Sequence, residues 1–134
     1  MKLVERWHSS RVHSNVTVAR WGHFGRPVIV FPTAGGDAEE IERMRLVDAC
    51  GELLEAGRVK LYSCDSVAGA VMLRGDGSPG YRAALLNAFH GFVREELVPA
   101  IRLDCQAPDI TVMTTGASIG AFNAVAALCR FPDV

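Results

Sequence analysis

The sequence predicts an α/β fold: a mostly parallel sheet that begins with an antiparallel hairpin and carries helices on both faces. Two short segments rich in β-branched and aromatic residues, 4–7 and 12–21, begin the chain and alternate as hairpin strands do. Strand-like and helix-like segments then alternate, which requires crossovers between parallel strands. The run PVIVF at 27–31 is apolar throughout, as expected of a strand covered on both faces.

The middle of the chain supplies a helix, a strand and a loop. Asp37, with Glu40 three residues later, makes a capping-box-like start for a helix whose apolar residues keep helical spacing to Gly57. Segment 59–64, VKLYSC, is the next expected strand. Segment 66–80 is rich in glycine and is expected to form a loop.

The last third supplies the longest helix and the final strand–helix pair. Residues 81–102 carry a broad apolar face, and Pro99 is expected to bend or tighten the last turn of that helix. Segment 109–114, DITVMT, is the next expected strand, and Ser118 begins the last helix. Ligands bind such sheets beyond the carboxyl ends of the strands, where loops 33–37, 65–69 and 116–120 are expected to meet.

Composition indicates one globular domain over residues 1–134. The chain is 49% hydrophobic and 22% charged, with a formal net charge of -1. This balance gives no electrostatic support for binding nucleic acid or an anionic membrane. Neither a signal peptide nor a long apolar segment is present, so we expect a cytoplasmic location. The cysteines, scattered at positions 50, 64, 105 and 129, lack the spacing of a zinc site, and no histidine cluster suggests another metal.

The motif Gly116-Ala117-Ser118-Ile119-Gly120 carries the chemistry. A serine between two glycines, after a strand and before a helix, is typical of a nucleophile at the apex of a sharp turn. Side chains at Gly116 and Gly120 would collide with neighbouring backbone. The turn directs the Ile119 N–H and the positive end of the helix towards the space above the serine, where an oxyanion could form.

A second N–H donor is expected from the loop after PVIVF. Thr33 or Ala34 is expected to supply this backbone N–H. Gly35 and Gly36 let this loop pass close to a substrate.

These two motifs resemble the α/β-hydrolase fold, and within it the esterase D-like esterases, over nearly the whole chain. The resemblance implies a serine hydrolase that acts on small-molecule carboxylic esters without a cofactor. It implies that Ser118 is the nucleophile and that the N–H groups of Ile119 and Thr33 form the oxyanion hole. Asp65 and Ser66, at the end of the second parallel strand, are placed either to touch substrate or, for Asp65, to cap a turn.

The sequence departs from that family after the nucleophile. The family order is serine, acid, histidine, yet Asp133 is the only carboxylate beyond Ser118, and no histidine comes after the serine. Asp133 lies about 20 Å away along the last helix. The histidines upstream, at 8, 13, 23 and 90, belong to the hairpin, a turn and mid-helix rather than to the site. We therefore expect the N-terminal portion of a hydrolase that alone turns over activated esters poorly or not at all.

An N-terminal portion would leave the strand at 109–115 unpaired on its outer side, which favours a second chain or a homo-oligomer covering that edge. Two other functions stay open. The chain could be a non-catalytic interaction module that keeps the elbow as a stable turn. The stretch Thr115–Phe122 also resembles the glycine-rich turn of nucleotide-binding dehydrogenases, although Phe122 replaces its third glycine. The glycine-rich stretch 75–80 lacks the lysine of a P-loop.

Overall fold

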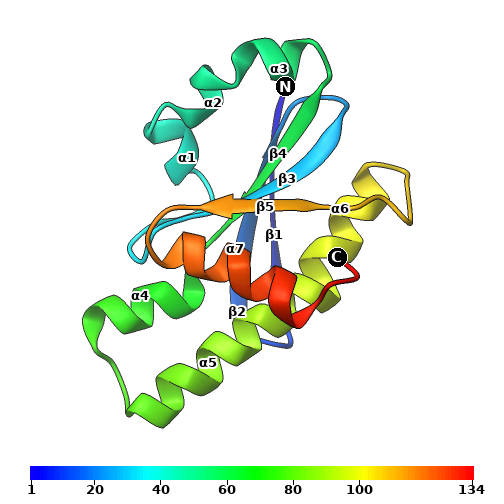
Figure 1. The fold of residues 1–134 in the computed structure, drawn as a ribbon. Helices are drawn as coiled ribbons and strands as arrows, with labels where there is room; N and C mark the ends of the chain where they lie inside the picture. The colour runs from blue at the N-terminus through cyan, green and yellow to red at the C-terminus, as the bar shows by residue number, and fades with distance from the viewer.

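The computed structural model describes residues 1–134 as a mixed five-stranded sheet with helices on both faces (Figure 1). The strands are β1 (Lys2–Ser9), β2 (Ser14–Trp21), β3 (Arg26–Phe31), β4 (Val59–Cys64) and β5 (Met113–Gly116), in the spatial order β1-β2-β4-β3-β5. β3 pairs in parallel with β4 and β5, whereas β1 with β2 and β2 with β4 are antiparallel. The predicted fold class, including its opening hairpin, is confirmed.

Helices form two layers around this sheet. They are α1 (Glu40–Arg43), α2 (Leu46–Ala49), α3 (Gly51–Glu55), α4 (Val67–Arg74), α5 (Pro79–Phe92), α6 (Val98–Asp104) and α7 (Ile119–Arg130), with a π-helical turn at Val93–Leu97. β3 is buried on both faces, as its apolar run predicts. Ile29 and Phe31 enter the larger core with α5, α6 and α7, while Val30 enters the smaller core with α1 and α3.

The single helix expected between Asp37 and Gly57 is wrong, because the segment forms three short helices. Arg45 interrupts it in the left-handed conformation, with φ at 65°. The expected capping box is also absent, and α1 begins without a side-chain cap. The Glu40 carboxylate does not bind the backbone N–H of Asp37, as a capping box requires, because it accepts hydrogen bonds from Thr33. Tertiary contacts therefore override the local signal.

The loop expected at 66–80 contains the two-turn helix α4, so that expectation is corrected. One glycine of this segment, Gly69, is required by packing. A Cβ at Gly69 would lie 2.9 Å from the Cα of Ala34, so this residue allows α4 to pack directly on the loop after β3. Ala68 and Gly69 are both buried there.

The long helix and the last strand are present with shifted limits, but the helix is widened before Pro99 instead of tightened in its last turn. Helical structure runs from Pro79 to Asp104, and before Pro99 it widens into the π-helical turn, in which Val98 N–H bonds to the Val93 carbonyl. A widened turn accommodates the proline, which has no N–H to donate. The strand expected at 109–114 forms over Met113–Gly116, pairs only with β3, and so lies at the edge of the sheet.

Candidate active site

Ser118 occupies a strained turn between β5 and α7. Its φ of 57° and ψ of -128° lie in a region that non-glycine residues rarely adopt. The serine is exposed, and its side chain does not cap the helix. A conformation that costs about 1–3 kcal/mol persists only where the surrounding structure imposes it. The predicted elbow geometry is present, with the hydroxyl-bearing residue at its apex.

The two glycines of the motif are required by close backbone contacts. A Cβ at Gly116 would lie 2.5 Å from the carbonyl carbon of Gly120, and a Cβ at Gly120 would lie 2.3 Å from the carbonyl oxygen of Phe31. Both separations are below any van der Waals contact. The turn is therefore pressed against the end of β3, which brings the elbow next to the loop that begins at Pro32.

The N–H of Thr33, expected as an oxyanion donor, is already engaged. It donates to Glu40 Oε2 at 2.7 Å, and the Thr33 hydroxyl donates to Glu40 Oε1 at 2.5 Å. Ala34 N–H makes no hydrogen bond within the chain. Ile119 N–H lies at the first position of α7, where helical N–H groups have no intrahelical acceptor. The N–H groups of Ile119 and Ala34 therefore have no acceptor within the chain, unlike that of Thr33.

The three loops expected to meet at the carboxyl ends of the strands do so. Ser66 N–H bonds to the Gly36 carbonyl at 3.3 Å, which joins the loops after β4 and β3. Gly36 also lies against Glu40, because a Cβ there would be 2.2 Å from Glu40 Oε2. Gly35, in contrast, is exposed.

Asp65 and Ser66 belong to the interior of this junction. Asp65 Oδ2 accepts the N–H of Thr17 at 2.8 Å, and Oδ1 accepts the N–H of Ala38 at 3.1 Å. Ser66 is buried. With both carboxylate oxygens occupied by backbone donors, Asp65 fastens β2 and the loop after β3 to the end of β4. The sequence left two roles open for Asp65, contact with substrate or the capping of a turn, and this arrangement matches the second.

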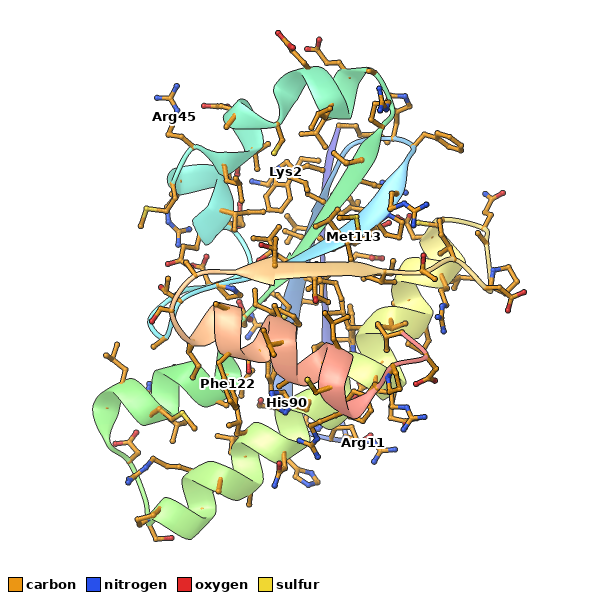
Figure 2. The ribbon with its side chains drawn as sticks, viewed as in Figure 1. Lys2, Arg11, Arg45, His90, Met113 and Phe122 are labelled. Carbon is orange, nitrogen blue, oxygen red and sulfur yellow. The ribbon has the colours of Figure 1, made fainter.

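None of the four histidines is held at the elbow. His8 and His13 are exposed on the hairpin, and His23 lies in the turn before β3, at the opposite end of the sheet. His90 lies between α5 and α7 (Figure 2) and is buried. Asp133 lies beyond the far end of α7, with its carboxylate 3.6 Å from Arg94.

His90 is a structural link between α5 and α7. Arg130 Nη1 lies 2.9 Å from Nδ1, and Asn123 Oδ1 lies 2.9 Å from Nε2. Because a guanidinium can only donate, Nδ1 is the acceptor, and Nε2–H donates to Asn123. Burial lowers the pKa of His90 below its ordinary value of 6.5; the Asn123 hydrogen bond opposes the shift, and the charge of Arg130 adds to it.

We predict that His90 makes the fold less stable in mild acid. The pKa of His90 is lower in the folded chain than in the unfolded chain, so the unfolded chain binds the extra proton as pH falls below about 6.5. Chemical denaturation at a series of pH values should show the free energy of unfolding decreasing from pH 7 towards pH 5. His90→Gln should flatten that decrease, whereas His23→Gln, at the exposed turn, should retain it. An equal slope in wild type and His90→Gln would contradict the assignment.

A cavity of about 450 Å³ opens beside the elbow. Ile41, Met44 and Leu46 form an apolar wall, and Gly116 and Ala117 form the side next to Ser118. Glu40 also lines it, but its carboxylate is bound to Thr33. The cavity therefore offers a mainly apolar surface adjacent to the serine.

Solved structures, rather than sequences, show what this chain is similar to. No family model and no curated protein sequence matches it. Among solved structures, a ferulic acid esterase aligns over 99% of this chain with a TM-score of 0.74 and 15% identity. The S-formylglutathione hydrolase from Agrobacterium tumefaciens aligns over 99% with a TM-score of 0.67 and 15% identity. The chain has the α/β-hydrolase fold.

The structure of a ferric enterobactin esterase from Salmonella typhimurium is also similar, with a TM-score of 0.64 and 19% identity over 99% of this chain. The chain covers 56% of the length of the ferulic acid esterase, 54% of the S-formylglutathione hydrolase and 34% of the enterobactin esterase. The resemblance inferred from the sequence is thus confirmed at the level of the fold. No helix here combines the length and apolar character needed to cross a bilayer.

Proposed function

We propose that this α/β-hydrolase fold serves as the nucleophile-bearing part of a serine hydrolase that acts on carboxylic esters. The observation that carries the proposal is the strained, exposed Ser118 at the start of α7. Three structures with esterase or hydrolase in their names share the fold. Backbone strain of this kind clusters at active sites, so a role in chemistry accounts for its position at an exposed serine.

In the proposed reaction, Ser118 Oγ attacks the ester carbonyl carbon and loses its proton to a general base. The negative charge that develops on the carbonyl oxygen is stabilised by the N–H groups of Ile119 and Ala34 and by the positive end of α7. Collapse of the tetrahedral intermediate breaks the ester C–O bond and releases the alcohol. The protonated base donates its proton to the departing alcohol oxygen. The base then takes a proton from a water molecule that attacks the acyl carbonyl carbon, and it donates this second proton to Ser118 Oγ as the carboxylic acid leaves. Apolar parts of the substrate would occupy the cavity beside Ile41.

We further propose that the general base comes from polypeptide other than these 134 residues. His90 is buried and engaged on both ring nitrogens. β5 is an edge strand, and Met113, Val125 and Leu128 are exposed on β5 and α7, with Met113 marked in Figure 2. A neighbouring strand paired with β5 would cover these apolar side chains and would end beside the elbow. Such a strand could carry the missing base.

Labelling with a fluorophosphonate tests the nucleophile directly. Ser118 Oγ should displace fluoride from phosphorus, and peptide mass spectrometry should place the adduct on Ser118. Ser118→Ala should lose the adduct completely, whereas Ser10→Ala, an exposed serine on the hairpin turn, should retain it. Failure to label Ser118, both in the chain alone and in assemblies that supply a base, would favour the non-catalytic interaction module.

The nucleotide-binding alternative gains no support from the elbow. The open side of Gly120 faces the carbonyl oxygens of Phe31 and Pro32, and carbonyl oxygens repel a pyrophosphate. An added dinucleotide should therefore leave the rate of fluorophosphonate labelling at Ser118 unchanged.

A further inference from the structure

We propose that the end of the sheet opposite Ser118 holds a binding site for a small phosphate-bearing ligand. A cavity of about 660 Å³ lies there, between the turns that enter β3 and β4 and the end of α6. That volume falls within the range of about 300–1,000 Å³ typical of small-molecule sites. The proposal is independent of the serine chemistry, since no residue of the elbow lines this cavity.

The lining of the cavity is cationic, although the chain as a whole is not. Arg26, Arg58 and Lys60 line it against a single carboxylate, that of Asp104. The chain carries a formal net charge of -1, so this concentration of positive charge does not reflect the general composition. A concave site with one sign of charge raises the local concentration of oppositely charged ligands.

The one carboxylate is already neutralised by other groups. Asp104 Oδ2 accepts hydrogen bonds from Lys60 Nζ at 2.6 Å and from the Tyr62 hydroxyl at 2.6 Å, and Arg20 Nε lies 3.4 Å from Oδ1. Burial alone would raise the pKa of Asp104, but these hydrogen bonds and the charges of Lys60 and Arg20 lower it overall. Asp104 is therefore ionised and fully engaged, and it does not neutralise the two arginines at the rim.

Those two arginines have no acidic partner. Arg58 makes no side-chain hydrogen bond or ion pair, and Arg26 bonds only to the neutral Thr111 hydroxyl, at 3.0 Å from Nη1. Several other arginines do pair with a carboxylate, as Arg43 does with Asp37. Guanidinium groups bind phosphate through paired N–H donors in a geometry that suits two of its oxygens. Two unpaired guanidinium groups on one cavity favour a phosphate over a singly charged carboxylate.

The backbone fixes both arginines on one rim. Arg26 N–H bonds to the Arg58 carbonyl at 3.0 Å, and β3 and β4 are in register from Arg26 opposite Val59. Gly25, at φ of 115°, allows the turn before β3 to lie close to the Arg58 backbone, because a Cβ there would lie 2.5 Å from the carbonyl carbon of Arg58. A rigid rim reduces the entropy lost when a ligand binds. His23 and Gln106 add hydrogen-bonding groups around the same cavity.

Isothermal titration of the chain with pyrophosphate, in a buffer of low chloride content, tests the site. We expect saturable binding of one pyrophosphate, weakened at least about tenfold by Arg58→Gln and by Arg26→Gln, as loss of a charge-assisted arginine–phosphate contact requires. Arg45→Gln is the matched control. It removes the same charge from an exposed arginine that precedes α2 and does not line the cavity (Figure 2). This variant should change the affinity less than about twofold.

Three results would overturn the proposal. They are the absence of saturable binding to the wild-type chain, an equal loss of affinity in Arg45→Gln and Arg58→Gln, and tighter binding of citrate than of pyrophosphate. Circular dichroism of each variant keeps the comparison valid. Arg26, Arg45 and Arg58 are exposed, so their replacement is expected to leave the fold intact.

Discussion

Gly120→Ala is expected to destabilise the fold by about 3 kcal/mol or more, an effect at or beyond the upper end of common overpacking costs. The added Cβ would lie 2.3 Å from the Phe31 carbonyl oxygen and 2.8 Å from the Pro32 carbonyl oxygen. Both are backbone atoms, so no side-chain rotation can relieve the overlap. Either α7 must move away from the sheet or the end of β3 must shift, and each change disturbs a close-packed interior.

Gly51→Ala is the matched control for this prediction. Gly51 begins α3, and a Cβ there would meet no atom within 4 Å. Alanine in a helix is favoured over glycine by about 0.5–1 kcal/mol, so this variant should be as stable as wild type or more stable. Urea denaturation of the two variants measures the difference. Equal stabilities for Gly120→Ala and Gly51→Ala would mean that the elbow is not pressed against β3.

The elbow was predictable from the sequence because its residues form a short contiguous motif, with one glycine two residues before Ser118 and another two residues after it. The contacts that require Gly116 and Gly120 are partly distant, since both glycines face the carbonyl oxygen of Phe31 at the end of β3. The apolar run of β3 was equally informative, since burial on both faces leaves a continuous signature.

The elements that the sequence did not reveal depend on distant contacts. Glu40 suits a capping box, but it binds Thr33, and this choice depends on where the end of β3 lies. Arg45 gives no sequence signal of its left-handed conformation. In α4 the glycine at 69 resembles a loop residue because its packing partner, Ala34, is distant in the sequence.

The same limit applies to the site. The pattern after β3 predicted a donor at Thr33 or Ala34, and only the position of the Glu40 carboxylate decides that Ala34 is the one left free. For Asp65, the sequence indicated the end of a parallel strand, where substrates and structural caps are both common. Its two backbone partners are Thr17, before β3 in the sequence, and Ala38, after β3. No local sequence pattern predicts either contact.

Asp65→Ala is expected to cost about 2–4 kcal/mol, because it leaves the N–H groups of Thr17 and Ala38 without acceptors in a partly buried junction. Asp65→Asn keeps one oxygen acceptor and replaces the other by a donor, so it should recover part of the loss at most. The measurement is the midpoint and slope of urea unfolding for the three chains.

Asp48→Ala provides the comparison at the surface. Asp48 is exposed and pairs with Arg45 three residues before it on the same helical segment, so its removal should cost less than about 0.5 kcal/mol. A wild-type midpoint for Asp65→Ala would refute the structural role. Unchanged stability combined with impaired fluorophosphonate labelling would instead indicate that Asp65 contacts the substrate. The stability of Asp65→Ala thus separates a residue that holds the three loops together from one that faces what they bind.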